Sequence, residues 1–177
     1  MLKSFLPLLL LAFLLPFASS SSSSPPDTVE QVDLSRYVGK WYEQASIPMV
    51  FAWFCKCSTA EYSAGEDGYV KVNNTCHRFG SFSSKLAKAW TVDSSHSKLK
   101  VQFFWPFSAD YWIVDLDPNY QWSVVSNSKK SYLWILSREV RLEKSVYTEI
   151  VERLKGRGFP VEELNVSDQS CYGDNKY

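Results

Sequence analysis

The side chains in this sequence best suited to chemistry are four cysteines, Cys55, Cys57, Cys76 and Cys171. Cysteine sulfurs bind metals, react in redox steps or form disulfides. Cys55-x-Cys57 would suit a metal or redox pair, but its spacing is C-x-C rather than C-x-x-C, and no second such pair or histidine pair follows. An even number of cysteines behind an apolar leader instead predicts two disulfides. Four cysteines allow three pairings, and spacing alone does not choose among them.

The other reactive residues do not form a recognisable catalytic set. The two histidines are His77, beside a cysteine that we expect to be bridged, and His96, in a polar turn. The sequence lacks a G-x-S-x-G elbow, a glycine-rich phosphate loop and an H-E-x-x-H motif. Asp110, Asp115 and Asp117 lie close together in sequence, whereas glycosidase carboxylates usually come from separate strands. We therefore expect no enzymatic activity, no cofactor and no metal.

Composition favours a binding protein over a nucleic-acid partner. Aromatic residues make up 16% of the chain and include seven tryptophans, more than one ordinary core needs. An apolar cavity lined with rings would use them. The formal net charge is zero and no basic stripe is present, so nucleic acid and anionic surfaces lack their main electrostatic attraction.

The chain begins like a secreted protein. Lys3 precedes an apolar core from Leu6 to Phe17, which is shorter than the ~20 residues of a membrane-spanning helix. Small residues follow, so we predict a cleaved signal peptide over residues 1–20 and secretion; an uncleaved N-terminal anchor is the alternative. Residues 21–30 form a Ser/Pro-rich spacer, and residues 31–177 are long enough for one domain.

The elements that must position any site are mostly strands. Runs with an alternating pattern are separated by short turn-forming segments, which predicts an all-β fold with eight antiparallel strands. Eight such strands close into a barrel that holds one small ligand and leaves no free edge. The expected strands are 41–47, 57–64, 69–76, 86–92, 98–104, 111–116, 121–125 and 132–138.

One helix interrupts this pattern near the C-terminus. The apolar residues Val146, Tyr147, Ile150, Val151 and Leu154 share one face of a helix. Glycines at positions 156 and 158 would end it. We expect this helix to pack outside the barrel, and the tail 161–171 to return to it.

Three segments together resemble the lipocalin signature. They are Gly39-Lys40-Trp41 before the first strand, the turn Asp117-Pro118-Asn119-Tyr120, and Tyr132 to Arg138. The resemblance covers roughly Leu34 to Cys171 and is closest to the apolipoprotein D and bacterial lipocalin branch, through Leu99–Phe107 and Tyr111–Val114. It implies an up-and-down barrel that carries a small hydrophobic ligand such as a fatty acid, a lysophospholipid or a sterol-like molecule. Because a few lipocalins are enzymes, isomerase or synthase activity is the enzymatic alternative.

The resemblance also implies roles for individual residues. The Arg138 guanidinium would stack on the Trp41 indole and close the barrel floor, although a strand-ending arginine can also simply reach water. Gly39 would permit the turn before Trp41. Asp117 and Tyr120 would brace a turn.

Strand parity then assigns the expected ligand site. If Arg138 points inward, so does Trp134 on the same strand. Phe103 and Trp105 share an inward parity with Val101. Two tyrosines match positions that line the apolipoprotein D pocket. The expected ligand-binding residues are Tyr62, Phe103, Trp105, Tyr111 and Trp134.

For the cysteines, the resemblance implies Cys57–Cys171 and Cys55–Cys76. The alternative in which Cys57 pairs with Cys76 across the hairpin stays open. Sequons at Asn73 and Asn165 predict glycosylation in a eukaryotic secretory pathway.

The aromatic loop from Pro48 to Phe54 suggests another function. At the barrel mouth, such an exposed apolar loop would contact a membrane or a protein, and a scavenger of damaged lipids would use the same pocket.

Overall fold

The protein is described by a computed structural model over residues 24–49, 52 and 54–173. The strands are β1 (Gly39–Ser46), β2 (Lys56–Ala64), β3 (Val70–Arg78), β4 (Ser81–Thr91), β5 (Lys98–Phe104), β6 (Phe107–Leu116), β7 (Trp122–Ser126), β8 (Leu133–Ser137) and β9 (Asn165–Val166). The helices are α1 (Leu34–Tyr37) and α2 (Lys144–Gly156), with 3-10 turns η2 (Glu66–Gly68), η3 (Val161–Glu163) and η4 (Ser170–Tyr172). The predicted signal peptide lies outside the described residues.

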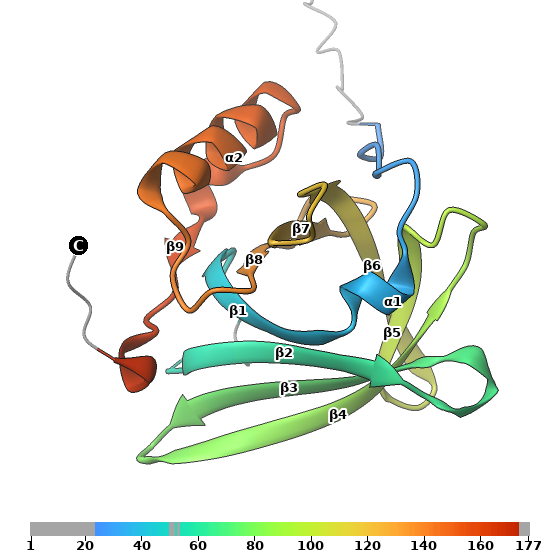
Figure 1. Ribbon diagram of the computed structural model, residues 1–177, viewed down its shortest axis with the longest axis horizontal. Coiled ribbons are helices and arrows are strands. Elements are labelled where there is room, and N and C mark those ends of the chain that lie inside the picture. The colour runs from blue at the N-terminus through green and yellow to red at the C-terminus, as the bar shows by residue number, and fades with distance from the viewer. Residues whose placement is uncertain (1–23, 50–51, 53, 174–177) are drawn as a thin grey trace, which may run out of the picture.

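The first eight strands form a closed antiparallel barrel, as the sequence predicts. Each strand from β2 to β7 pairs with the strand that follows it, and β1 pairs with both β8 and β2. In Figure 1, β2, β3 and β4 form one wall, and α2 lies outside the opposite side, beyond β7 and β8. Closure pairs each barrel strand on both sides over at least part of its length, which leaves few free edges.

The seam between β1 and β2 is closed by the C-terminal tail. The two strands pair directly only from Gly39–Tyr62 to Tyr42–Thr59. Further along β1, its free side pairs instead with β9. The Gln169 side chain donates one hydrogen bond to the Glu43 carbonyl at 2.6 Å and another to the Ser58 carbonyl at 3.0 Å, which joins β1 to β2. The tail therefore acts as a wedge between two strands that have diverged.

Buried apolar residues form two clusters on opposite sides of the barrel wall. The inner cluster includes Trp41, Tyr62 and Leu136, and the outer one joins strand residues such as Ile135 to Ile150 and Leu154 of α2. Leu136 and Ile135 are adjacent on β8 and face opposite sides, as strand geometry requires. The predicted apolar face of α2 thus packs outside the barrel.

Two hairpins are longer than the sequence pattern predicts. β4 begins at Ser81 rather than at residue 86, and β6 begins at Phe107 rather than at residue 111. The β3–β4 turn has positive φ at both Phe79 (52°) and Gly80 (85°), the conformation of a tight two-residue hairpin turn. The added segments are exposed on both faces, so they show no apolar alternation.

The N-terminal segment also differs from its prediction as a spacer. Val29 donates its backbone N–H to the Ile113 carbonyl, and Thr28 accepts a hydrogen bond from Ser97. Contacts with the barrel therefore begin before residue 31.

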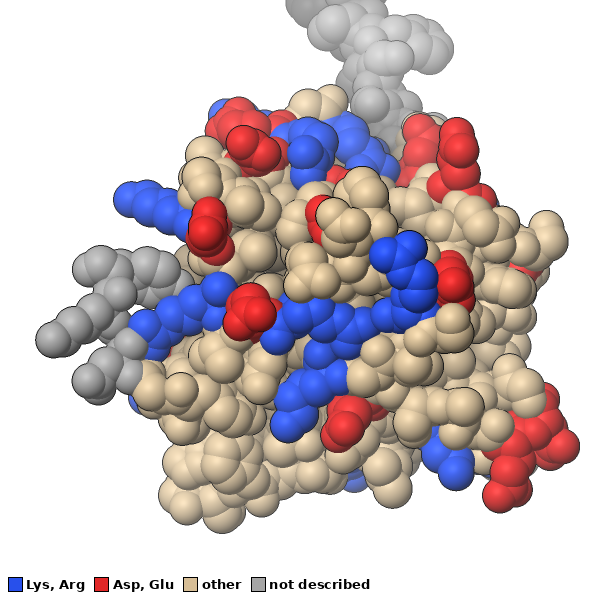
Figure 2. Space-filling model, in the orientation of Figure 1, with Lys and Arg blue, Asp and Glu red and all other residues tan. Residues whose placement is uncertain are grey.

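Charges of both signs are mixed over the face shown in Figure 2, with no surface of one sign. Over the part of the chain that the structure covers, no helix combines the length and apolar character needed to cross a membrane.

Candidate functional site: the barrel interior and its floor

The floor of the barrel is built on Arg138 and Trp41. The Arg138 guanidinium lies 3.7 Å from the centre of the Trp41 ring, and Trp41 is fully buried. Gly39 has φ of 98°, and a Cβ there would lie 3.1 Å from Arg138 Nη1, so only glycine fits this approach. The guanidinium donates hydrogen bonds to the backbone carbonyls of Arg36, Tyr37, Val38, Lys40 and Tyr120.

The Asp117–Tyr120 turn supports the same end of the barrel. The Asp117 carboxylate accepts hydrogen bonds from the backbone N–H groups of Asn119 (3.0 Å) and Gln121 (3.1 Å), which is a turn brace. The Tyr120 hydroxyl accepts the Asp33 N–H at 2.9 Å. Because Asp33 caps α1, this turn fixes the helix that covers the floor.

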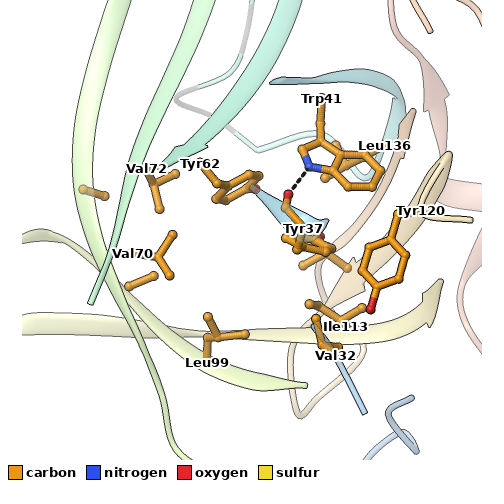
Figure 3. Packing of buried hydrophobic residues seen from close by; sticks show 13 residues of the cluster. Val32, Tyr37, Trp41, Tyr62, Val70, Val72, Leu99, Ile113, Tyr120 and Leu136 are labelled. Atoms are coloured by element: carbon orange, nitrogen blue, oxygen red, sulfur yellow. Dashed lines mark hydrogen bonds between the residues drawn. The ribbon is translucent and has the colours of Figure 1, made fainter. Parts of the chain in front are cut away.

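Above the floor, three tyrosine hydroxyls meet inside the barrel. Tyr111 Oη lies 2.9 Å from Tyr37 Oη and 2.7 Å from Tyr62 Oη, and Tyr37 Oη lies 3.0 Å from Ser123 Oγ. Figure 3 shows Tyr37 and Tyr62 with their rings turned toward each other beside Trp41, whose indole N–H donates to the Tyr37 carbonyl. Burial raises the pKa of Tyr37 to about 12 and also raises the pKa of Tyr62 and Tyr111, so the hydroxyls stay neutral.

These tyrosines line an apolar cavity in the barrel. Its remaining lining is aliphatic: Leu34, Val38, Val70, Val72, Ala89, Leu99 and Ile113. None of the described side chains that line it carries a charge. The site is an apolar enclosure of about 20 Å³ with one group of neutral hydroxyls, so its lining must move apart to admit a hydrophobic molecule with a small polar group.

The residues expected to bind ligand lie at different heights in the barrel. Tyr62 and Tyr111 line the cavity, and Trp134 is half-buried against the inner cluster. Phe103 is 37% exposed near the end of β5. Trp105 does not point inward as predicted; it is 86% exposed in the β5–β6 turn. The pairing of β5 with β6 is irregular between Val101 and Phe104. The inward or outward alternation of side chains along β5 therefore does not extend to Trp105.

Two residues of the interior were missed by sequence reasoning. Tyr37 comes from α1, whose four residues are too few for a helical pattern to be seen. The Glu43 carboxylate accepts hydrogen bonds from Ser46 (2.9 Å) and from Ser167 of the tail (2.6 Å), and burial raises its pKa. Only its place two residues after Trp41, with the same parity, could have indicated an inward carboxylate.

The structure contains the two disulfides that the resemblance implies, Cys55–Cys76 and Cys57–Cys171. The first joins the start of β2 to β3, and the second joins β2 to the tail. In residues 24–49, 52 and 54–173, no group of three or more His, Cys, Asp or Glu side chains could hold a metal ion.

The two sequons lie in different surroundings. Asn165 is exposed on β9, whereas Asn73 is half-buried on β3. Glycosylation at both stays a prediction.

Sequence comparisons agree with this architecture. Residues 32–169 match the family described as "Lipocalin-like domain". The chain is 36% identical over 146 residues to outer membrane lipoprotein Blc of Vibrio cholerae, covering 78% of this chain and 85% of the relative. It is 33% identical to temperature-induced lipocalin-1 of Arabidopsis thaliana, with 81% and 83% covered. It is 32% identical to apolipoprotein D of Macaca fascicularis, with 86% and 85% covered.

Solved structures show the same fold. Insecticyanin from the tobacco hornworm Manduca sexta superposes with a TM-score of 0.67 at 18% identity, covering 81% of this chain and 84% of that one. The cockroach allergen Per a 4 gives a TM-score of 0.64 at 22% identity, with 85% and 98% covered. With its closed barrel, its Trp41–Arg138 floor and the match over residues 32–169, this chain belongs to the lipocalin family.

Proposed function

We propose that this protein is a secreted carrier that reversibly binds a small hydrophobic ligand, such as a fatty acid, a lysophospholipid or a sterol-like molecule, in the barrel cavity. Lipocalins bind small hydrophobic ligands, and family members are generally binding or transport proteins. The observation that carries the proposal is the uncharged cavity lined by aliphatic side chains and three tyrosines. Affinity would come from apolar burial, at ~25 cal/mol per Å² before ordering costs.

Trp134 gives this proposal a spectroscopic test. It packs against the inner cluster and its ring centre lies 5.9 Å from that of Tyr132 at the mouth. We expect its fluorescence to change on titration with dodecanoic acid or lysophosphatidylcholine, and Trp134→Ala to weaken binding. Trp90→Ala is the matched control. Trp90 is exposed and follows the buried Ala89 on β4, so its side chain lies on the outer face of the barrel.

Different outcomes test the role of Trp134 and the carrier function. A folded Trp134→Ala variant with unchanged affinity would show that Trp134 is not in the ligand site. If lipid extraction and native mass spectrometry of the secreted protein find no bound lipid, and no titrated lipid binds, the carrier function is wrong.

A second candidate function is peripheral contact with a membrane through the barrel mouth. Of the predicted mouth loop, Val50, Phe51 and Trp53 lie outside the described residues, but Phe54 is exposed and its ring lies near that of Phe79. The β3–β4 and β5–β6 turns add further exposed rings: Phe79, Phe82, Phe104, Trp105 and Phe107. The lower left of Figure 2, over the β3–β4 turn, is free of charged residues.

Cations flank these rings. Arg78 lies over the Phe79 ring and Lys85 over the Phe104 ring, at 5.5 and 4.7 Å from the ring centres. Residues 77–86 and 102–109 contain no Asp or Glu. Exposed rings beside cations favour a lipid surface with some anionic headgroups.

Vesicle flotation tests this second function. We expect the protein to float with phosphatidylcholine vesicles that contain phosphatidylserine, and the double variant Phe79→Ser/Trp105→Ser to float less. Leu86→Ser is the control, because Leu86 is also an exposed apolar residue but lies on the outer face of β4. Equal loss in the control and the double variant would contradict docking through the mouth.

A further inference from the structure

The hydroxyls inside the barrel form a single chain whose ends differ. The order is Ser123, Tyr37, Tyr111 and Tyr62, and three hydrogen bonds join these four groups. Ser123 is fully buried and is not part of the cavity lining, whereas the three tyrosines line it. One end of the chain is therefore inside the wall and the other faces the ligand cavity.

A count of protons shows that this series of hydrogen-bonded hydroxyls lacks one acceptor. Each hydroxyl has one proton to donate, so four hydroxyls supply four protons and the three bonds use three. Among the described residues, none accepts the fourth proton. If Ser123 carried it, the proton would be buried without an acceptor, which is unfavourable. The chain is thus oriented with Ser123 donating to Tyr37, and the unused proton is on Tyr37, Tyr111 or Tyr62, the three hydroxyls at the cavity.

The electrostatics of the cavity limit which acceptor can use that proton. None of the described residues that line the cavity is a cation. Arg138 exerts an electrostatic effect on Tyr37 and Tyr62, but its guanidinium already donates to backbone carbonyls and stacks on Trp41. A buried carboxylate would be desolvated without a partner ion, whereas an uncharged carbonyl oxygen needs only one donor.

We propose that these tyrosines donate their one unused proton, from Tyr37, Tyr62 or Tyr111, to the carbonyl oxygen of an uncharged lipid, such as an ester, ketone or aldehyde, which enters carbonyl first with its apolar chain toward the mouth. This inference rests on the proposed carrier function and narrows its ligand class. A charged headgroup is excluded from the floor and stays at the mouth.

Three ligands with the same chain length test the inference: dodecane, methyl dodecanoate and sodium dodecanoate. Dissociation constants are measured by calorimetry on the full-length secreted protein. We expect methyl dodecanoate to bind about tenfold more tightly than dodecane, the effect of one hydrogen bond. In Tyr37→Phe/Tyr62→Phe/Tyr111→Phe the rings remain and all three cavity hydroxyls are removed, so we expect dodecane affinity to be kept and the preference to fall below about threefold.

The control is Tyr42→Phe, which removes a hydroxyl outside the barrel, where the Tyr42 ring packs on Tyr172. It should keep the preference for the ester. The inference is overturned if the wild type binds ester and alkane equally, if the folded triple variant keeps the preference, or if dodecanoate binds more tightly than the ester. Dodecane binding in those cases leaves the carrier function standing, whereas failure of all three ligands overturns both.

Discussion

At the residue scale, Arg138 combines two kinds of contact that the sequence motif alone does not separate. It stacks on Trp41, and it donates to backbone carbonyls on both sides of Gly39 as well as to the Tyr120 carbonyl. The planar guanidinium can make both contacts at once. Its flat face covers the indole, while its N–H groups point outward in its own plane to the carbonyls around it.

We expect Arg138→Ala to lower the free energy of unfolding by about 2 kcal/mol, because it removes a cation–π contact and the donor to several exposed or partly buried backbone carbonyls. Arg138→Lys should recover only part of this, since an ammonium cannot reach the same carbonyls. Urea unfolding measures both. Ligand affinity should change much less, so a variant that loses binding at unchanged stability would contradict a structural role.

The Glu43 carboxyl gives a prediction about pH. Burial raises its pKa above the ordinary value of 4.5, although hydrogen bonds from Ser167 and Ser46 act in the opposite direction. The unfolded chain ionises first as pH rises, so this group's contribution to stability falls between pH 4.5 and its folded pKa, and then levels off.

Glu43→Gln keeps an accepting oxygen but does not ionise. We therefore expect the variant to gain stability relative to wild type as pH rises through that window, and the difference to be smallest below pH 4.5. Denaturation at several pH values from acid to neutral measures the difference, in which the other carboxyls cancel. A difference that stays constant or shrinks toward neutral pH would contradict a raised pKa for Glu43.

The floor could be predicted residue by residue, whereas the interior could be predicted only in part. Trp41, Asp117 and Arg138 stand in a recognisable motif, and parity places Trp134 inside. Trp105 could not be placed by parity, because an irregular pairing precedes it. The inward carboxylate of Glu43 is stabilised by a tail residue more than a hundred positions away, which no local pattern contains.

At the element scale, the tail is the part of the fold on which barrel closure depends. It pairs with β1 through β9, and Asp168 accepts the Cys57 N–H at 2.6 Å with its backbone carbonyl. Lys56 forms an ion pair with the Asp168 side chain, which is exposed and contributes little. The Cys57–Cys171 bond fixes this arrangement covalently.

We expect the two disulfides to contribute unequally. On the chain-entropy model, Cys57–Cys171, which spans 114 residues, stabilises by about 5 kcal/mol, and Cys55–Cys76, which spans 21, by about 3 kcal/mol. Replacing Cys57 and Cys171 by Ser should lower the denaturation midpoint more than replacing the other pair. It should also expose the segment after Leu164 to protease. Resistance of that segment in the Cys57/Cys171 variant would show that the wedge does not need its disulfide.

The sequence predicted all eight barrel strands and the main helix, because each has an apolar face of the proper period. It could not predict α1 or β9, which are too short for any period to show. The predicted bounds of β4 and β6 were too short, because the parts of these strands near the mouth are exposed on both faces and show no alternating pattern. Such segments are held by backbone pairing to a neighbour rather than by burial.

At the scale of the whole molecule, we expect the outer apolar cluster to affect mainly stability and the inner apolar cluster to affect ligand binding as well. The outer cluster packs α2 against the wall, and the inner one surrounds the cavity. We expect Ile150→Ala, at a fully buried position of α2, to destabilise by about 3 kcal/mol without changing ligand affinity. Val151→Ala, on the same helix but half-buried, should destabilise less. A loss of affinity in a folded Ile150→Ala protein would show that the clusters are coupled through the wall.

The wedge at the β1–β2 seam has a consequence for how the protein is made. β1 is the first strand to be synthesised, yet its partners include β8 and β9, which are among the last. While the ribosome is still adding residues, β1 can pair only with β2, over four positions. The nascent chain therefore emerges as an open sheet with unpaired strand edges and an exposed apolar inner face, a state prone to aggregate. The barrel can close only after translation has reached the final residues that seal it.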